Sequence, residues 1–241
     1  ARNEGDQVEI LSGVFEGKTT GTPISLIVYN KDQRSRDYGS IANTYRPGHA
    51  DYCFDSKYGF RDYRGGGRSS GRETIGRVAA GAIAAKILRE LGITLQAYTY
   101  SIGPVACHSF HPEVIPENSF YMPDMVAAQK ATQYLEQCMK EYDSAGGVIE
   151  CRIKGVPAGI GDPVFGKLDA AFAQALMSIG AVKAVEVGDG TKVSTLKGST
   201  DNDGFHMEDG KIVKTTNHSG GILGGISDGG EILLRAHVKP T

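Results

Sequence analysis

The stretch R-D-Y-R-G-G-G-R-S-S-G-R-E-T-I-G-R-V-A-A-G-A-I-A-A-K-I-L-R-E-L spans residues 61–91 and joins a segment rich in glycine and arginine to an apolar one. Apolar residues in its second half recur at intervals of three and four, which predicts a helix over residues 70–91. Ser70 and Glu73 have the spacing of a capping box, so the helix is expected to begin beside the glycines. Six positions form the face that we expect to be buried: Ile75, Val78, Ala79, Ala82, Ile83 and Ile87.

Other elements are predicted on either side of this helix. Helices are expected over residues 123–142 and 165–179. Strands are expected over residues 7–14, 23–29, 147–156, 182–187 and 231–238, the last with Ile232, Leu234, Ala236 and Val238 on one side. The segment over residues 30–67 is irregular, and residues 191–216 have the composition of an exposed hairpin or flexible excursion. No linker is evident, so we expect a mixed α and β fold in a single domain, residues 1–241.

The composition limits the possible partners. The 241 residues are 40% apolar, which allows a sizeable core, and their formal net charge of −2 gives no overall attraction to nucleic acid or anionic membranes. The most apolar helical stretch contains Lys86, Arg89 and Glu90, which excludes a membrane-spanning segment there. Because no signal peptide opens the sequence, we expect a cytoplasmic protein without membrane or nucleic-acid partners.

The cysteines give no sign of a disulfide framework or a metal centre. They are widely and irregularly spaced, with no C-x-x-C pair and no histidine at metal-ligand spacing: Cys53, Cys107, Cys138 and Cys151. We therefore expect reduced cysteines and no bound metal.

Residues 61–73 have the composition of a phosphate-binding loop. Glycines let the backbone approach a ligand closely, and the first N–H groups of a helix lack internal partners at the positive end of its dipole. The same stretch is crowded with guanidinium groups that could bind phosphate or carboxylate, those of Arg61, Arg64, Arg68 and Arg72. Alternatively, these arginines pair on a solvated surface with Asp51, Asp55, Asp62 and Glu73. Arginines and glycines near tyrosines would also suit single-stranded RNA, but the negative net charge opposes that function.

A histidine precedes this loop by about twenty residues, in the run R-P-G-H-A-D-Y over residues 46–52. The unperturbed pKa of histidine allows proton transfer near neutral pH. An isolated histidine is more often structural, but His49 has Arg46 and a Pro-Gly turn beside it, so we consider it a catalytic candidate. The remaining histidines lack such neighbours and are expected at the surface or in packing: His108, His111, His206, His218 and His237.

Several of these runs together resemble the chorismate synthase family. They are R-P-G-H-A-D-Y, R-G-G-G-R-S-S-G-R-E-T followed by R-V-A-A-G-A, V-P-A-G-I-G-D-P-V-F, L-M-S-I-G-A-V-K-A-V-E-V-G-D-G, N-H-S-G-G-I-L-G-G-I-S and the closing H-V-K-P-T. The resemblance extends over residues 8–241. It implies an α+β fold in which helices are layered between antiparallel β-sheets, as a β-α-β sandwich, and an assembly of four identical subunits.

The resemblance also implies an activity. The family eliminates phosphate in the 1,4-anti sense from 5-enolpyruvylshikimate 3-phosphate to give chorismate, the last common step of aromatic amino acid biosynthesis. It requires reduced FMN although no net oxidation occurs, and NADPH is needed only where the enzyme reduces its own flavin. Such a site needs cations around a phosphate and two carboxylates, and a proton donor beside the flavin.

The matching motifs assign expected roles to residues of this chain. His49 is similar to the catalytic histidine that protonates or electrostatically supports the reduced flavin. The expected substrate-binding residues are Arg46, Ser70 and Arg72. The expected FMN-binding residues are Arg68, Ser69, Ser70, Gly180, Ala181, Gly224, Lys239, Pro240 and Thr241, with Lys239 suited to the flavin phosphate.

Two family segments, with the runs G-E-S-H-G and R-H-D-P-C, have no counterpart in residues 1–241. The first would supply an acid and cations, and the second an arginine and an aspartate near the flavin. The alternative to a complete enzyme is therefore a catalytically incomplete core that binds flavin or phosphate without turnover.

Overall fold

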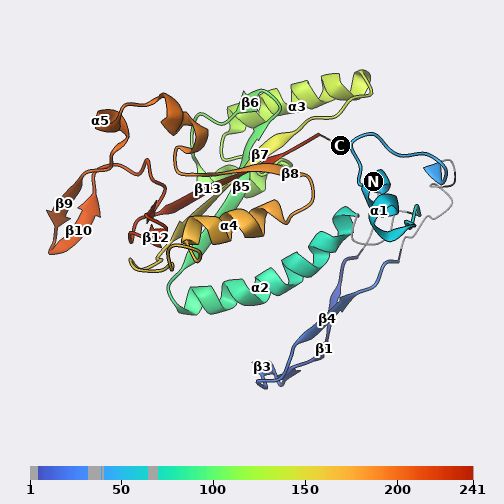
Figure 1. Cartoon of the computed structure of the whole chain (residues 1–241), viewed down its shortest axis with the longest axis horizontal. Helices are drawn as coiled ribbons and strands as arrows, with labels where there is room; N and C mark the ends of the chain where they lie inside the picture. The colour runs from blue at the N-terminus through green and yellow to red at the C-terminus, as the bar shows by residue number, and fades with distance from the viewer. Residues whose placement is uncertain (1–4, 32–38, 40, 65–69, 241) are drawn as a thin grey trace. The chain divides into compact units, whose positions relative to one another are not determined.

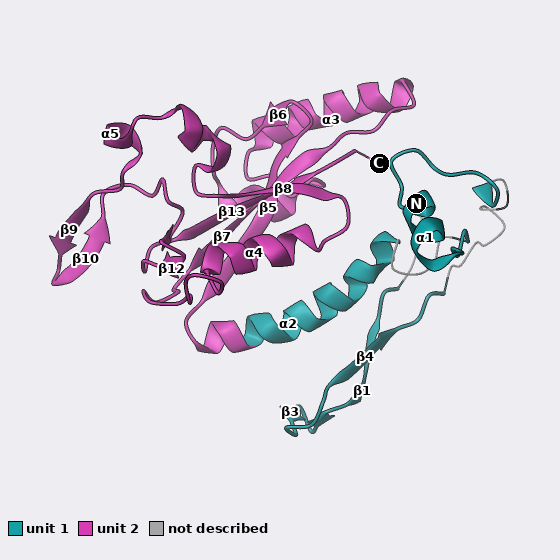
Figure 2. Cartoon of the chain, viewed as in Figure 1, with its two compact units in different colours: residues 1–86 teal, residues 87–241 magenta. Residues whose placement is uncertain are grey.

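The computed structural model of the chain describes residues 5–31, 39, 41–64 and 70–240. The chain separates into two compact units, residues 1–86 and residues 87–241 (Figure 2). A single domain over residues 1–241 remains a prediction. Among the described residues, none of the helices combines the length and the apolar character that crossing a membrane requires.

Unit 1 begins with short strands in two antiparallel pairs, β1 (Val8–Ser12) with β4 (Ser25–Val28) and β2 (Val14–Phe15) with β3 (Lys18–Thr19). These pairs confirm the strands predicted over residues 7–14 and 23–29. The chain passes from the first pair to the second at Gly13, where φ is +82°. A Cβ atom at Gly13 would lie 2.7 Å from the carbonyl oxygen of Pro23, so only glycine fits this crossing without strain.

A short helix, α1 (Asp51–Tyr58), lies within the segment that we predicted to be irregular. The prediction was wrong there because the apolar residues of this helix do not recur on one face, and Asp51 is its single buried side chain. The helix ends at Gly59, which adopts the left-handed conformation with φ of +79°. Its N-terminus therefore serves to hold Asp51 in place rather than to bury an apolar stripe.

The helix predicted over residues 70–91 is confirmed as a 3-10 turn, Gly71–Glu73, that continues into α2 (Thr74–Glu90). The predicted burial of its apolar face is wrong, because no residue of α2 is buried. Val78 is 72% exposed and Ile87 is 60% exposed. The spacing of apolar residues predicts which side of a helix is apolar, but it does not predict whether other residues cover that side. Among the described residues, none covers the apolar side of α2 fully.

The start of this helix has half of the predicted capping box. Ser70 is extended and its hydroxyl accepts a hydrogen bond from the backbone N–H of Arg72 at 3.3 Å. The carboxylate of Glu73 instead accepts from Nε of Arg77, at 3.1 and 3.2 Å. The pair is one turn apart on an exposed surface, where such ion pairs stabilise a helix only slightly.

Unit 2 is built on a five-stranded antiparallel sheet in the order β6-β5-β7-β13-β8 (Figure 1). Its strands are β5 (Thr94–Ile102), β6 (Val105–Ala106), β7 (Gly147–Lys154), β8 (Val182–Val187) and β13 (Ile232–Val238). The last three confirm the predictions over residues 147–156, 182–187 and 231–238. We did not predict β5, although its sequence T-L-Q-A-Y-T-Y-S-I is rich in residues that favour strands.

One face of this sheet packs against α4 (Leu168–Met177) (Figure 1). Ile232 and Leu234 alternate along β13 and are almost fully buried, as predicted, with exposed fractions of 0% and 3%. From the helix, Leu168, Phe172 and Leu176 pack against this cluster. The helix lies within the predicted residues 165–179.

The second helix of unit 2, α3 (Met125–Lys140), lies within the predicted residues 123–142. Asp124 caps it by accepting hydrogen bonds from the backbone N–H groups of Val126 and Ala127, both at 3.0 Å. Its buried alanines pack with Met122 against β5 and β6. A 3-10 helix, Pro112–Glu117, precedes it.

The segment predicted as an exposed hairpin or excursion contains a 3-10 helix (Gly190–Thr195), the short helix α5 (Gly198–Asp201) and the hairpin β9 (Phe205–Glu208) with β10 (Lys211–Lys214). The hairpin prediction is confirmed. A second small hairpin follows, β11 (Ile222–Leu223) with β12 (Ile226–Ser227). All four cysteines are free, as expected. Helices and antiparallel sheets together confirm the predicted α+β class.

Candidate active site

The run R-P-G-H-A-D-Y forms a tight cluster around the carboxylate of Asp51. Nε of Arg46 donates to Oδ2 of Asp51 at 2.8 Å, and a terminal nitrogen of Arg46 donates to Oδ1 at 2.9 Å. The backbone N–H of Arg46 also donates to Oδ2, at 3.1 Å. This two-pronged pairing fixes the plane of the guanidinium group relative to the carboxylate.

The imidazole of His49 joins the same cluster through Nδ1. This atom lies 3.0 Å from Oδ1 of Asp51 and 3.1 Å from a terminal nitrogen of Arg46. The side chain of His49 is 26% exposed, whereas that of Asp51 is 4% exposed. Both contacts involve Nδ1, so Nε2 is the ring atom that lies away from the cluster and can exchange a proton with a ligand.

Asp51 is negatively charged at neutral pH. The hydrogen bonds from Arg46 are the main reason that its pKa is held well below the usual value of an aspartate, although burial opposes them. The nearby charge of a protonated His49 acts in the same direction. The ionised carboxylate of Asp51 and the guanidinium group of Arg46 together hold the ring of His49 at Nδ1.

Arg61 and Arg64, which precede the glycine-rich loop, pair with carboxylates, as the alternative interpretation held. Arg61 binds Asp55 and Asp51 and donates to the carbonyl oxygens of residues 41, 42 and 44. Its side chain is 10% exposed and stacks on the ring of Tyr45. Arg64 pairs with Asp62 at 3.0 Å on the surface. Arg61 is thus a structural residue that shapes the cluster.

The loop itself is described only in part. Arg68 and Ser69, both expected to contact FMN, lie outside the described residues. Ser70 is described as the helix cap, and the backbone N–H of Arg72 is its partner. The expected substrate and flavin contacts of Ser70 and Arg72 remain predictions.

The predicted flavin-binding residues of unit 2 fall into two groups. In the first, the carbonyl oxygen of Ala181 accepts a hydrogen bond from the backbone N–H of Lys239 at 3.0 Å. Gly180 precedes Ala181, and Nζ of Lys239 donates to the carbonyl oxygen of Pro240 at 2.9 Å. Thr241 lies outside the described residues. These four described residues gather where α4 leads into β8, beside the end of β13.

Gly224 belongs to the second group and lies near the other end of β13. It occupies the turn between β11 and β12 with φ of +60°. The base of this hairpin packs against Ile232, the first residue of β13. A strand of seven residues is about 20 Å long, so Gly224 and Lys239 do not adjoin within one copy of the chain.

Within the described part of the chain, three side chains offer ligand atoms within 4.8 Å of one another: Asp189, Asp201 and His218. Nδ1 of His218 lies 2.8 Å from Oδ2 of Asp189. That hydrogen bond is the main reason that the pKa of Asp189 is lowered. His218 thus has a structural partner, in keeping with the packing role that we expected.

The whole chain, residues 1–241, matches the family model described as chorismate synthase. It is a member of the chorismate synthase family. Two chorismate synthases similar to it are those of Agathobacter rectalis, 63% identical over 242 residues, and Lachnoclostridium phytofermentans, 64% identical over 243 residues. Both alignments cover 100% of this chain and 66% of the relative, so the chain spans slightly less than two thirds of their length.

A solved structure gives the same family assignment. The crystal structure of a chorismate synthase matches with a TM-score of 0.83 and 33% sequence identity, covering 97% of this chain and 71% of that one. This match confirms the fold that the resemblance implied, with helices and antiparallel sheets in the arrangement of chorismate synthases.

Sequence reasoning identified His49 and Arg46 but assigned no role to Asp51 beyond pairing with an arginine. The signal lay within the same run, because Asp51 follows His49 by two residues at the start of a helix. A helix N-terminus with a buried aspartate can position both neighbours at once. In this structure the Asp51 carboxylate contacts both the imidazole of His49 and the guanidinium group of Arg46.

Proposed function

We propose that this chain is part of a chorismate synthase, a lyase that converts 5-enolpyruvylshikimate 3-phosphate to chorismate by 1,4-anti elimination of phosphate. The observation that carries the proposal is the family match over all 241 residues, at 63% identity to a chorismate synthase. The cluster of Arg46, His49 and Asp51 supports it, since it offers a proton donor with a carboxylate behind it.

His49 is the catalytic residue of this proposal. Its Nε2 carries the proton that supports the reduced cofactor, while Nδ1 is held by the Asp51 carboxylate and the Arg46 guanidinium. The Asp51 carboxylate keeps the ring in one orientation. Arg46, Ser70 and Arg72 bind the anionic groups of the substrate in the same proposal.

Reduced FMN is the proposed cofactor, and the residues of the chain fit its phosphate. Among the described residues no carboxylate pairs with Lys239, whose ammonium group donates to the Pro240 carbonyl oxygen. An ammonium group without a carboxylate partner suits a phosphate. When bound, the reduced flavin supplies electron density transiently, so the overall reaction involves no net oxidation. NADPH enters only if the enzyme reduces its own flavin.

The proposal extends to assembly and location on the strength of family membership. We propose a homotetramer in the cytoplasm. Light scattering of the full-length protein after size-exclusion chromatography checks the assembly, and a mass of one subunit would contradict it.

The test of activity is an anaerobic assay of the full-length protein with 5-enolpyruvylshikimate 3-phosphate and chemically reduced FMN. Chorismate and inorganic phosphate are expected to appear in equal amounts. A related chorismate synthase assayed in parallel is the positive control. If that control works and the full-length protein forms no chorismate, the proposed activity is wrong.

The alternative from the sequence, a core that binds flavin or phosphate without turnover, is tested with the 241-residue chain alone. Quenching of flavin fluorescence without chorismate formation would support it. Chorismate formation by the 241 residues alone would exclude it.

A further inference from the structure

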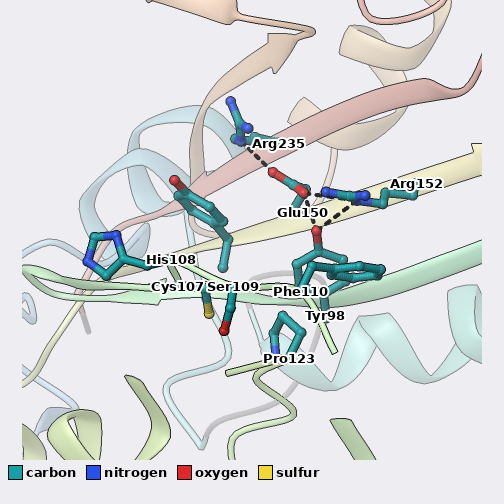
Figure 3. A pocket seen from close by; sticks show the side chains of 10 residues that line it. Tyr98, Cys107, His108, Ser109, Phe110, Pro123, Glu150, Arg152 and Arg235 are labelled. Atoms are coloured by element: carbon teal, nitrogen blue, oxygen red, sulfur yellow. Dashed lines mark hydrogen bonds and ion pairs between the residues drawn. The ribbon is translucent and has the colours of Figure 1, made fainter. Parts of the chain in front are cut away.

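A second polar site lies in unit 2, on the face of the five-stranded sheet opposite α4. It is a cavity of about 170 Å³ (Figure 3). Its walls include aromatic rings from β5 and the following loop, and charged side chains from β7 and β13: Tyr98, Tyr100, Phe110, Glu150, Arg152 and Arg235. None of these residues is among those predicted from the sequence to bind substrate or flavin.

The carboxylate of Glu150 lies at the bottom of this arrangement and is 2% exposed. Its Oε1 accepts a hydrogen bond from the hydroxyl of Tyr98 and lies 3.4 Å from Nε of Arg152. Its Oε2 accepts from Nε of Arg235 at 2.7 Å. One carboxylate thus holds two guanidinium groups, one at each oxygen, as the dashed lines in Figure 3 show.

Aromatic rings fix both guanidinium groups further. The Arg152 group lies over the ring of Phe110, 4.1 Å from its centre, and the Arg235 group lies over Tyr100 at 5.0 Å. Both arginines approach Glu150 through Nε, so their terminal nitrogens point elsewhere. Among the residues that the structure describes, Nη2 has no hydrogen-bond partner in either arginine, while Nη1 of Arg235 reaches the Gly188 carbonyl oxygen at 3.3 Å.

The cavity wall carries more positive than negative charge. Two guanidinium groups face the single carboxylate of Glu150. Glu231 lies 3.7 Å from Arg152 at the edge of the site, but it also pairs with Lys154 at 3.5 Å. Glu186 is the strand neighbour of Arg235, yet its carboxylate binds Thr191 and His237. One positive charge therefore remains without a carboxylate of its own.

We propose that this cavity binds a small oxyanion, a phosphate or a carboxylate, through the terminal nitrogens of Arg152 and Arg235. Guanidinium groups that are already oriented lose little freedom on binding an anion. Ser109 and His108 also line the cavity, and their backbone N–H groups donate to Asp124. Glu150 does not touch the anion and acts as the positioning residue for both arginines.

The size of the cavity limits the class of ligand. Pockets for drug-sized molecules have volumes of roughly 300–1,000 Å³, so a flavin or a pyridine nucleotide is too large for about 170 Å³. The site is therefore separate from the proposed flavin site. The Cys107 thiol in its wall is not a reactive group, because burial raises its pKa to about 11.

The proposal is tested by calorimetric titration of the full-length protein with inorganic phosphate and, separately, with benzoate. Arg235→Gln and Arg152→Gln are each expected to weaken binding about tenfold or more, since each removes charged hydrogen bonds to the anion. Lys211→Gln is the control, because it removes an exposed cation of β10 that does not line the cavity. That variant is expected to bind within about twofold of the original protein.

Arg235→Lys is a second variant, which tests whether affinity falls in a protein that still folds. Lysine keeps the charge beside Glu150 but has no second nitrogen for the anion, so affinity should fall while the melting temperature stays close to the original. Phosphate inhibition of chorismate formation, which reports the proposed active site, should not change in any of these variants.

The two titrants identify the source of the oxyanion. Binding of phosphate or of benzoate that Arg152→Gln and Arg235→Gln weaken supports the proposal and shows which anion the cavity accepts. Binding of neither anion, or binding that these two variants weaken no more than Lys211→Gln does, would overturn it, because no anion would then be held by the two arginines.

Discussion

Asp51 in unit 1 and Glu150 in unit 2 are both buried carboxylates, with exposed fractions of 3% and 2%, and each holds cationic side chains. Their partners differ in one respect. Asp51 binds an imidazole as well as arginine, whereas the cations on Glu150 are both guanidinium groups. An imidazole gains and loses a proton near neutral pH and a guanidinium does not, so the first cluster suits proton transfer and the second suits constant attraction of an anion.

The largest expected effect is on turnover when the imidazole of the first cluster is removed. His49→Ala in the full-length protein should lower the rate of chorismate formation by about 10²–10⁴-fold, which is the usual contribution of a positioned proton donor. Flavin affinity should change little. Anaerobic kinetics with reduced FMN and flavin titration measure the two quantities.

The control for this variant is His111→Ala, which removes a histidine that lies 3.5 Å from a carboxylate but is 59% exposed. Its activity should equal that of the original protein. A His49→Ala variant with unchanged turnover would show that the imidazole has no catalytic part.

Removing the second carboxylate should chiefly lower stability. Glu150→Ala leaves two partly buried guanidinium groups without the carboxylate that they share, and breaking an ion pair with a buried member costs up to about 3–5 kcal/mol in the free energy of unfolding. Denaturation by urea measures this loss. A cost below about 1 kcal/mol would mean that the pair contributes no more than an exposed one.

Acid should act on the first cluster through Asp51. Its folded pKa lies below the ordinary aspartate value of about 3.9, so its stabilising contribution is complete above that pH and is lost as the pH falls through the folded value. Asp51→Asn removes this contribution. Below pH 4 the variant should therefore lose less stability on acidification than the original protein, as measured by urea denaturation at successive pH values. Parallel curves for the two proteins would contradict this account.

The same substitution separates the two roles of Asp51. Asparagine keeps the shape of the side chain but not its charge, so His49 should lose the charged partner that orients its ring and turnover at neutral pH should fall. Unchanged turnover at neutral pH would show that Asp51 contributes to stability alone.

The smallest effects should come from the residues on either side of the glycine-rich loop. Ser70→Ala removes the cap of the helix and should cost about 1 kcal/mol in the free energy of unfolding. Arg64→Gln breaks a pair whose arginine is 58% exposed, and it should cost less than about 1 kcal/mol. Urea denaturation distinguishes the two, and a larger loss for Arg64→Gln would mean that this pair has a structural role.

The sequence predicted those helices and strands whose hydrophobic pattern lies within a short stretch of residues. The apolar periodicity of α2 and the alternation in β13 are each contained in fewer than twenty residues. The burial of α2 could not be predicted in the same way, since it depends on what lies against the helix. Helix α1 was missed because its one buried side chain is a carboxylate, which no hydrophobic pattern reveals.

The candidate sites follow the same division. The proximity of His49 and Arg46 could be predicted because only Pro47 and Gly48 separate them. The pairing of Glu150 with Arg235 joins residues 85 positions apart, and it arises only when β7 and β13 align in register. The separation of Gly224 from Lys239 could not be predicted either, because a family motif does not show how far apart its residues lie in the folded chain.

The shared carboxylate of Glu150 also constrains how this family can diverge. An aspartate at that position would be one methylene shorter and could not keep both oxygens on their arginines without moving the strands. Loss of either arginine would leave a buried charge with half of its neutralising contacts. Single substitutions at these three positions should thus be selected against, and natural variants that change one of them should carry compensating changes at the other two.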